Sequence, residues 1–151
     1  MLQLATASQR DDVNRLACQI HDLHVSYRPD LFEHCPERYS EDSFLVGIKN
    51  RNIYVAMLED QVVGYVLLTT HPRQGAGLVT VKVMEIVEFC VDEALRGHGI
   101  GKTMMEDVHA LARAFGCDRL LLGVHPENDG AVAFYQKCGF MIRTIHMDSI
   151  V

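Results

Sequence analysis

A short run of glycines between two basic residues is the segment whose chemistry is clearest. It extends from Arg96 to Lys102 and reads Arg-Gly-His-Gly-Ile-Gly-Lys, between a stretch with a strand pattern and a stretch with a helical pattern. At such a turn, glycines let the backbone approach a ligand closely, and the first N–H groups of the helix have no partner within it and point at an anion. Since Arg96 and Lys102 add positive charge, the run predicts a phosphate-binding turn.

Three glycine-rich patterns compete for this run, and two of them fail at a defined position. A dinucleotide fingerprint needs G-x-G-x-x-G, whereas Lys102 stands where its third glycine belongs. A P-loop needs G-x-x-x-x-G-K-[ST], and its first glycine would be Arg96. The pattern R-x-x-G-x-G is met by Arg96, Gly99 and Gly101. A tight turn that binds nothing is a further alternative, because glycine-rich turns are common.

A second segment, residues 128–140, decides among these interpretations. It reads Asn-Asp-Gly-Ala-Val-Ala-Phe-Tyr-Gln-Lys-Cys-Gly-Phe. It resembles the element N-x-x-A-x-x-[FLY]-Y-x-K-x-G-F of the GNAT family of acetyl-CoA-dependent N-acetyltransferases, in which the R-x-x-G-x-G turn holds the pyrophosphate of coenzyme A. Neither a P-loop ATPase nor a Rossmann enzyme predicts such a segment. The resemblance is strongest over residues 84–147, and residues 24–32 are similar to a segment of some members.

The resemblance implies a fold and a cofactor site. The fold is an α/β one of the acyl-CoA N-acyltransferase type, with a mixed, mainly antiparallel central sheet and helices on both faces. Its long strand and the next strand splay apart to admit the pantetheine arm of acetyl-CoA, which is the acyl donor; no metal is expected. The implied cofactor contacts are Phe89, Cys90, Val91, Arg96, Gly97, His98, Gly99, Ile100, Gly101, Lys102, Asn128, Tyr135 and Lys137. Helix capping is the alternative role for Asn128, and simple solvation the alternative for Lys137.

Acetyl transfer to an amine needs two proton movements, and three residues are candidates for them. The ammonium must lose a proton before it attacks, and the leaving sulfur benefits from gaining one. The resemblance assigns the acid to Tyr135, with core packing as the alternative. Glu85 and Glu88 on the long strand are candidate bases, on opposite faces unless a bulge shifts the register. Glu85 is preferred because it interrupts a row of valines, where an unpaired carboxylate is unfavourable to bury; a surface carboxylate is the alternative for either.

The remaining nucleophiles and histidines favour structural roles. The five cysteines have no C-x-x-C spacing and mostly lie in apolar segments, so we expect neither disulfides nor an acyl-enzyme. Cys90 is expected to pack in the core. His21 and His24 have a spacing compatible with one metal ion, but no second pair exists, so a zinc site is not expected. His125 is expected to approach the acceptor.

Hydrophobic periodicity and the positions of turn-forming residues assign these residues to predicted strands and helices. We expect strands over residues 2–6, 53–58, 62–70, 79–91, 119–124 and 140–147, and helices from Ser8, from near Ser40, over 100–115 and over 127–138. The S-x-x-D pattern at Ser8 predicts the first helix start, and Gly116 and Gly139 predict two helix ends. About eleven residues follow Phe140, enough for one closing strand where many relatives have two. An exposed edge is a liability that a partner subunit would cover, so a homodimer is expected.

Composition narrows the functional class. With 151 residues, 48% hydrophobic and 23% charged, the chain is expected to form one domain over residues 1–151. The net charge of −6 argues against nucleic acid and anionic membranes as partners. Neither an apolar stretch of about 20 residues nor a signal peptide is recognised, which predicts a cytoplasmic protein.

These observations lead to one main hypothesis. The chain is expected to be an N-acetyltransferase that moves an acetyl group from acetyl-CoA directly to a primary amine of a small molecule or peptide. A catalytically silent acyl-CoA-binding sensor or subunit is the alternative, and a P-loop nucleotide-binding module is a third. The acceptor is left open among polyamines, aminoglycosides, free amino acids and protein N-termini.

Overall fold

A five-stranded mixed sheet runs through the molecule in the order β1-β2-β3-β4-β5. The computed structural model describes all of residues 1–151. The strands are β1 (Leu2–Leu4), β2 (Ile53–Leu58), β3 (Gln61–Arg73), β4 (Val81–Val91) and β5 (Arg119–Leu122), and the helices are α1 (Arg10–Tyr27), α2 (Glu41–Lys49), α3 (Ile100–Ala114) and α4 (Asp129–Lys137). Neighbouring strands are antiparallel except β4 and β5, which are parallel. The predicted mixed, mainly antiparallel sheet is therefore confirmed.

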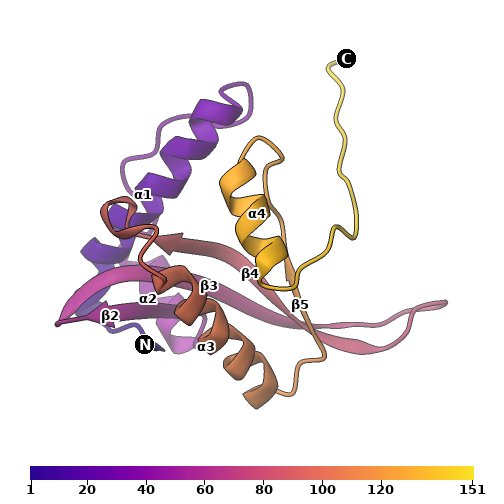
Figure 1. Cartoon of the computed structure of the whole chain (residues 1–151), viewed down its shortest axis with the longest axis horizontal. Helices are drawn as coiled ribbons and strands as arrows, with labels where there is room; N and C mark the ends of the chain where they lie inside the picture. The colour runs from indigo at the N-terminus through magenta and orange to yellow at the C-terminus, as the bar shows by residue number, and fades with distance from the viewer.

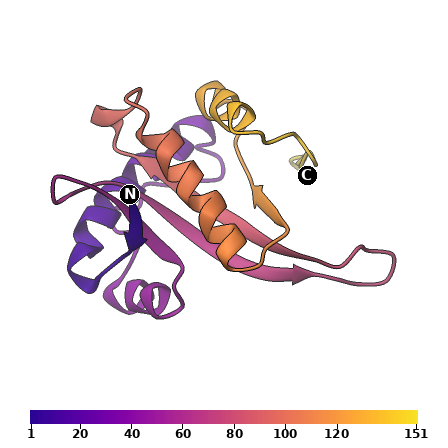
Figure 2. The same cartoon turned by 60° about the horizontal axis from the view of Figure 1, so that its bottom comes forward.

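Helices cover both faces of the sheet, as Figures 1 and 2 show. On the face covered by α1 and α2, the buried cluster consists of Ala5, Val13, Leu16, Ala17, Phe44, Ile53, Val55, Val62, Tyr65 and Cys90. On the face covered by α3 and α4, it consists of Tyr54, Val66, Leu68, Met84, Ile86, Met105, Val108 and Ala112, with Phe134 and Tyr135 of α4 packed against it. We call these the α1/α2 face and the α3/α4 face. α1 and α3 each bury an apolar stripe, which is what their 3.6-residue periodicity predicts.

Local signals end or begin three of the helices where the sequence predicts. The Ser40 hydroxyl accepts a hydrogen bond from the N–H of Ser43 at 3.2 Å and caps α2. α3 and α4 are followed by Gly116 and Gly139, whose φ angles of 66° and 91° suit a left-handed helix end. None of the helices combines the length and the apolar character that a membrane crossing requires.

The first helix begins differently from the prediction. A 3-10 turn over Ala7–Gln9 precedes α1, and the side-chain oxygen of Gln9 accepts a hydrogen bond from the N–H of Thr6 at 2.9 Å. The predicted start at Ser8 and Asp11 is therefore wrong. The S-x-x-D pattern and the Thr6–Gln9 pair both place a polar side chain within reach of a free N–H group. The structure has the hydrogen bond of the Thr6–Gln9 pair.

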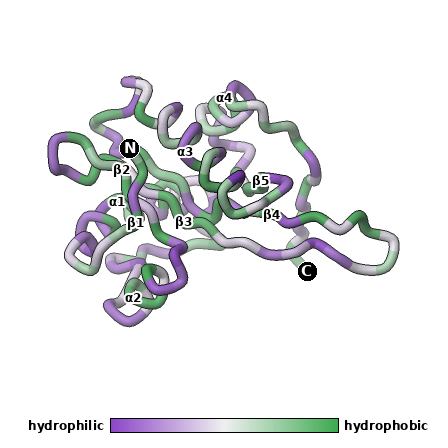
Figure 3. The backbone as a smooth tube through the Cα atoms, turned by 90° about the horizontal axis from the view of Figure 1, so that it is seen from below, coloured by the Kyte–Doolittle hydropathy of each residue, from purple (hydrophilic) through white to green (hydrophobic).

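The hairpins of the sheet are made by neighbouring strands. The β2–β3 turn consists of Glu59 and Asp60, whose φ angles of 46° and 64° give the two-residue turn that matches the twist of paired strands. The β3–β4 hairpin is much longer and projects beyond the helices (Figure 1). Its end contains the exposed hydrophobic residues Leu78 and Val79. Figure 3 shows hydrophobic, green backbone on this projecting loop.

The predicted closing strand over residues 140–147 is wrong. Phe140 is held at the end of α4, because its N–H bonds to the carbonyl of Tyr135 at 3.0 Å and its ring packs on the Tyr135 ring at 5.8 Å. Residues 141–151, which we call the tail, form no strand and extend away from the body (Figure 1). Alternating apolar residues favour a strand, but a strand also needs a neighbour for its backbone groups, and none lies alongside the tail.

Candidate active site

A β-bulge divides β4 at the point where β5 ends. Leu67 of β3 pairs with Glu88, whereas Leu68 pairs with Ile86, so Val87 is an extra residue without a partner on β3. The parallel pairing of β4 with β5 ends at Ile86 and Leu122, although β4 continues to Val91. The two strands therefore part at the bulge, and we call this point the fork.

The bulge also decides which way the two glutamates face. Directly paired residues of neighbouring strands point to the same face, and Glu85 pairs with Thr69 while Glu88 pairs with Leu67. Leu67 packs on the α1/α2 cluster, and Thr69 lies two residues further along the same strand. Both glutamates consequently lie on the α1/α2 face. The expectation of opposite faces fails because the extra residue at Val87 reverses the alternation.

Glu88 lies within a network of hydroxyl groups and one cation. The Tyr65 hydroxyl donates to its carboxylate at 2.7 Å, and the Tyr39 hydroxyl donates to the same oxygen. Arg38 forms an ion pair with the other oxygen at 3.4 Å, and the Glu88 side chain is 17% exposed. Burial, followed by the Glu88 charge, raises the pKa of both tyrosines, so they remain protonated donors. The arrangement holds the carboxylate in one orientation.

Glu85 has no comparable surroundings. It lies between Thr69 of β3 and Leu121 of β5, where the sheet is paired on both sides, and its carboxylate makes no hydrogen bond or ion pair. The structure thus places Glu88, not Glu85, at the fork and in a polar network. Which of them accepts a proton is still a prediction.

The residues around Glu88 are not among those predicted from the sequence. Tyr65 carries a signal, because it is the one aromatic residue in the aliphatic run over residues 62–68. Tyr39 and Arg38 lie in an irregular segment before α2, and no local pattern predicts their contact with a residue about fifty positions later. Their role emerges only from the tertiary structure.

Two histidines from elements that are far apart in the sequence lie next to each other. The rings of His24 on α1 and His125 after β5 are 4.8 Å apart, and Phe32 lies 5.6 Å from each of them. Burial lowers the pKa of His24, and His125 and His21 lower it further, so His24 is uncharged at neutral pH. No group of three or more His, Cys, Asp or Glu side chains is arranged to hold a metal ion. The approach of His125 to an acceptor stays a prediction.

The glycine turn has the backbone that a phosphate-binding site requires. Gly97 and Gly99 have φ angles of 81° and 82°, and a Cβ built on either would meet nothing within 4 Å, so the space beside the backbone is open. The N–H of Thr103 bonds to the carbonyl of Gly99 at 3.1 Å. The N–H groups before it, on residues 100–102, precede the first intrahelical bond and are free to bind an anion.

The polar side chains of the turn take different positions. The Arg96 guanidinium donates to the carbonyl of Val91 at 3.1 Å, which folds it back over the end of β4. The His98 ring lies 3.0 Å from the carbonyl of Arg96, within the turn itself. Lys102 is exposed and forms no ion pair. The turn therefore presents backbone N–H groups, with Lys102 as the cation that is free.

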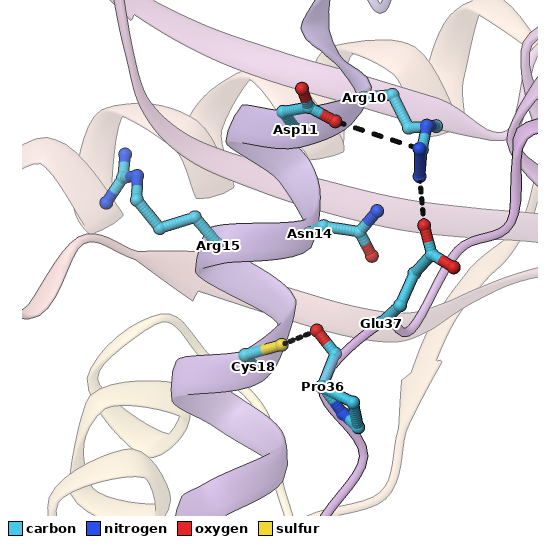
Figure 4. Close-up of a pocket in the computed structure, with 7 residues that line it drawn as sticks. All are labelled: Arg10, Asp11, Asn14, Arg15, Cys18, Pro36 and Glu37. Atoms are coloured by element: carbon cyan, nitrogen blue, oxygen red, sulfur yellow. Dashed lines mark hydrogen bonds and ion pairs between the residues drawn. The ribbon is translucent and has the colours of Figure 1, made fainter.

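Two shallow pockets lie on α1, outside the fork, and only the second borders the turn. The first, drawn in Figure 4, is lined by Arg10, Asp11, Asn14, Arg15, Cys18, Pro36 and Glu37 and contains none of the predicted site residues. The second is lined by Arg15, Cys18, Gln19, Asp22, Leu23, Ser26, Glu93 and Arg96. Arg15 forms an ion pair with Asp92, and the Gln19 side chain accepts the N–H of Glu93 at 3.0 Å. These contacts fix α1 to the segment that leads into the turn.

The last helix packs Tyr135 against the part of β4 beyond the fork. Asn128 caps α4, because its side-chain oxygen accepts the N–H of Ala131 at 3.1 Å, and its amide group remains free to donate. The Tyr135 ring contacts Phe89 at 6.3 Å and Phe134 at 5.3 Å. Its hydroxyl makes no hydrogen bond within the chain, and burial raises the pKa of Tyr135 to about 12. Tyr135 is therefore a protonated donor without a partner.

The cysteine nearest the fork is part of the core. Cys90 is buried in the α1/α2 cluster, and its Sγ lies 3.5 Å from the carbonyl of Leu16. Burial raises the pKa of the Cys90 thiol to about 12. Such a thiol is protonated and a poor nucleophile at neutral pH, which is consistent with the predicted packing role.

Comparison with known proteins identifies the family. Residues 17–140 match the family model described as acetyltransferase (GNAT) family. The chain is 34% identical over 96 residues to the uncharacterised N-acetyltransferase YvbK of Bacillus subtilis, a match that covers 63% of this chain and about half, 56%, of that relative. It is 31% identical to the peptidyl-lysine N-acetyltransferase YjaB of Salmonella typhimurium, covering 81% of this chain and 67% of that protein.

A solved structure gives the same answer for the fold. The crystal structure of the F44R mutant of the BH1408 protein from Bacillus halodurans superposes with a TM-score of 0.94 and 26% identity, over 100% of this chain and 99% of that one. The family model covers most of the chain, and both motifs that carry the resemblance lie on the elements that the fold requires. The chain belongs to the acetyltransferase (GNAT) family.

Proposed function

We propose that the chain transfers the acetyl group of acetyl-CoA directly to a primary amine of a small molecule or peptide. The observation that carries this proposal is the fork. At Ile86 the long strand loses its partner β5; it ends five residues later at Val91, and the glycine turn begins at Arg96. A strand edge with free backbone groups thus runs toward a helix N-terminus that suits a phosphate.

The residues at the fork fit the two parts of coenzyme A. Beyond Ile86, the edge of β4 toward β5 has backbone N–H and C=O groups without a strand partner, and the main chain of Phe89, Cys90 and Val91 belongs to this edge. Pantetheine contains amides that match such groups. The N–H groups at the start of α3 and the Lys102 cation suit the pyrophosphate. The free amide of Asn128 and the exposed Lys137 would add contacts from α4.

Two residues of the chain would move the protons. Glu88 would accept a proton from the acceptor ammonium, directly or through one water molecule, and the neutral amine would then attack the thioester carbonyl. As the C–S bond breaks, the Tyr135 hydroxyl would give its proton to the leaving thiolate, and the second proton that the attacking nitrogen loses as the amide forms would return to Tyr135 through solvent. Geometry supports Glu88 over Glu85, because only Glu88 lies at the fork. Glu85 remains the alternative base.

The proposed scope is one catalytic domain over residues 1–151 with an amine as its partner. YjaB, the relative described above, acts on peptidyl-lysine, which supports a primary amine as the acceptor class. His24, whose pKa responds to the Glu88 charge, packs beside Phe32 and His125, so the amine would enter beside flat ring side chains.

The experiment that tests this function measures binding and turnover separately. Calorimetry of the purified chain with acetyl-CoA reports on the fork and the turn. Release of free thiol in the presence of a panel of amines, including a lysine peptide, reports on transfer. We expect saturable binding and amine-dependent release. Binding without release for every amine would contradict transferase activity and favour an acyl-CoA sensor, and no binding at all would contradict the site.

A further inference from the structure

The two carboxylate oxygens of Glu88 have different surroundings. The hydroxyls of Tyr39 and Tyr65 both donate to one oxygen, Oε2. The other oxygen, Oε1, has a single contact, an ion pair with Nη2 of Arg38 at 3.4 Å. This separation is longer than a charge-assisted hydrogen bond, which is about 2.7–2.9 Å. Oε1 is therefore the oxygen available to take a proton from an acceptor, and Arg38 lies beside it.

Most of the donors of the Arg38 guanidinium are unused. Nη2 contacts Glu88, whereas Nη1 and Nε donate to no oxygen of the chain. The side chain is 34% exposed, so a ligand can reach these groups. A guanidinium presents its N–H groups as a planar fork, which matches a carboxylate with parallel hydrogen bonds. Arg38 can consequently keep its contact with Glu88 and bind a second anion at the same time.

The backbone of Arg38 is fixed by a buried side chain of α1. Asn14 is 9% exposed, and its side-chain oxygen accepts the N–H groups of Arg38 at 3.0 Å and Tyr39 at 2.8 Å. The amide group of Asn14 donates to the carbonyl of Tyr39 at 2.9 Å. These bonds hold the irregular segment before α2 where it passes Glu88. A guanidinium on a fixed backbone is preorganised, which reduces the entropy lost when a ligand binds.

The charge of Arg38 affects which amine can approach Glu88. An ammonium that reaches Oε1 lies close to the guanidinium, since both contact the same oxygen atom, and the two positive charges repel each other. An acceptor with a carboxylate next to its amine offsets this repulsion, because the carboxylate pairs with Nη1 and Nε of Arg38 while the amine pairs with Oε1. A polyamine or a lysine side chain has no carboxylate in that position and keeps the repulsion.

We propose that the acceptor is a free α-amino acid, which has a carboxylate on the carbon next to its amine, and that Arg38 binds this carboxylate. The inference rests on the proposed function, because it needs Glu88 beside the reacting amine. Besides burial, the charges of both Glu88 and Arg38 act on the pKa of His24, which places His24 and its neighbours Phe32 and His125 close to this pair. These rings would face the side chain of the amino acid.

Matched pairs of acceptors test the inference. Each α-amino acid of a panel is compared with its carboxamide, which keeps the amine and the side chain but lacks the negative charge, and thiol release with acetyl-CoA gives kcat/KM for both. In Arg38→Gln the ratio of the two values should fall by about 10- to 150-fold, the effect of losing a hydrogen bond to a charged group. The ratio cancels any effect of the variant on Glu88, because both acceptors use the same base. Asn14 bonds to the backbone of Arg38, so the variant keeps these bonds and its Tm should stay close to that of the wild type.

Two further variants separate the fork of the guanidinium from its charge. Arg38→Lys keeps the charge without the planar fork, so it should lose only part of the preference. Arg73→Gln removes the same charge at the end of β3, in the projecting hairpin, and should leave the ratio unchanged. Equal ratios in the wild type and Arg38→Gln would overturn the inference, and so would acetylation of other amines but of no amino acid. No turnover with any amine would overturn the proposed function, and this inference with it.

Discussion

The two halves of β4 differ in what flanks them. Residues 81–86 have β3 on one side and β5 on the other, whereas residues 87–91 keep β3 alone and lead into the glycine turn. The first half is ordinary sheet, and its glutamate, Glu85, has no polar partner. The second half contains the re-aimed Glu88, a free backbone edge and the approach to a helix N-terminus. The difference indicates that the candidate site lies where β4 loses its neighbouring strand β5, because the backbone groups of β4 are free to bind a ligand only there.

The largest effect is expected in the turn that ends the second half. In Gly99→Val, a branched side chain must adopt a φ near 82°, a strain of about 1–2 kcal/mol. Displacing the phosphate from one N–H removes a hydrogen bond to a charged group, about 1.5–3 kcal/mol. Because the free turn relieves this strain by leaving the binding conformation, both terms oppose binding and together lower acetyl-CoA affinity by about a thousandfold in calorimetry. Gly77→Val is the matched control, with a φ of 76° in the distant hairpin loop; equal losses in both variants would remove the turn from the binding site.

The next largest effect separates the two halves directly. Glu88→Gln should lower kcat/KM by roughly several hundredfold at neutral pH, the size expected for loss of a general base, whereas Glu85→Gln should keep nearly full activity. Part of the Glu88→Gln loss should be recovered at higher pH, where the acceptor amine is deprotonated in solution. Steady-state rates between pH 7 and 10 check this. If instead Glu85→Gln loses activity and recovers part of it at higher pH, the base is Glu85, in the half of β4 that is paired with β5.

A smaller effect is expected on the α4 side of the fork. Tyr135→Phe should lower kcat by about a hundredfold while acetyl-CoA affinity and Tm stay close to those of the wild type. Because the pKa of Tyr135 is raised to about 12, deprotonation of Tyr135 should not lower the wild-type rate below pH 10. Phe134→Leu is the control for packing and should lower Tm instead. A Tyr135→Phe variant with full turnover would leave this tyrosine a structural role.

The smallest effect concerns the rings that bridge α1 and the segment after β5. Burial lowers the pKa of His24 in the folded chain, so below pH 6.5 the unfolded chain takes up a proton that the folded chain resists. Stability should therefore decrease as the pH falls from 7.5 to 5.0. Urea unfolding should show a smaller decrease for His24→Phe, which keeps a ring but cannot titrate. His125, His21, Glu88 and Arg38 surround the same ring, and an identical decrease in the variant would assign the pH effect to them.

Much of this molecule was predictable because it depends on local sequence. The turn, the two final helices and the caps at Ser40 and Asn128 depend on residues within a few positions of one another, and the structure has them where the patterns indicate. The mixed sheet with helices on both faces followed from the family resemblance, since periodicity alone gives only an α/β or α+β class.

Non-local features were not predictable in the same way. The bulge at Val87 reverses the alternation on which the preference for Glu85 depended, and it exists only in the register of β4 against β3. The tail has a strand pattern but no neighbour, because pairing depends on an edge that no sequence window contains. The contact of Tyr39 with Glu88 likewise joins residues 49 positions apart.

The short β2–β3 turn has a consequence for the order of folding. β2, β3 and β4 follow one another in sequence and close through hairpins, so little chain entropy is lost when they pair. β5 joins the sheet only after the whole of α3 has crossed over it, and it gains four residue pairs in return. The three-stranded meander should therefore form early and open last, and β5 should be the first strand to detach. Native-state hydrogen exchange under mild denaturant would show this sequence as amides of β5 that exchange through smaller openings than those of β3.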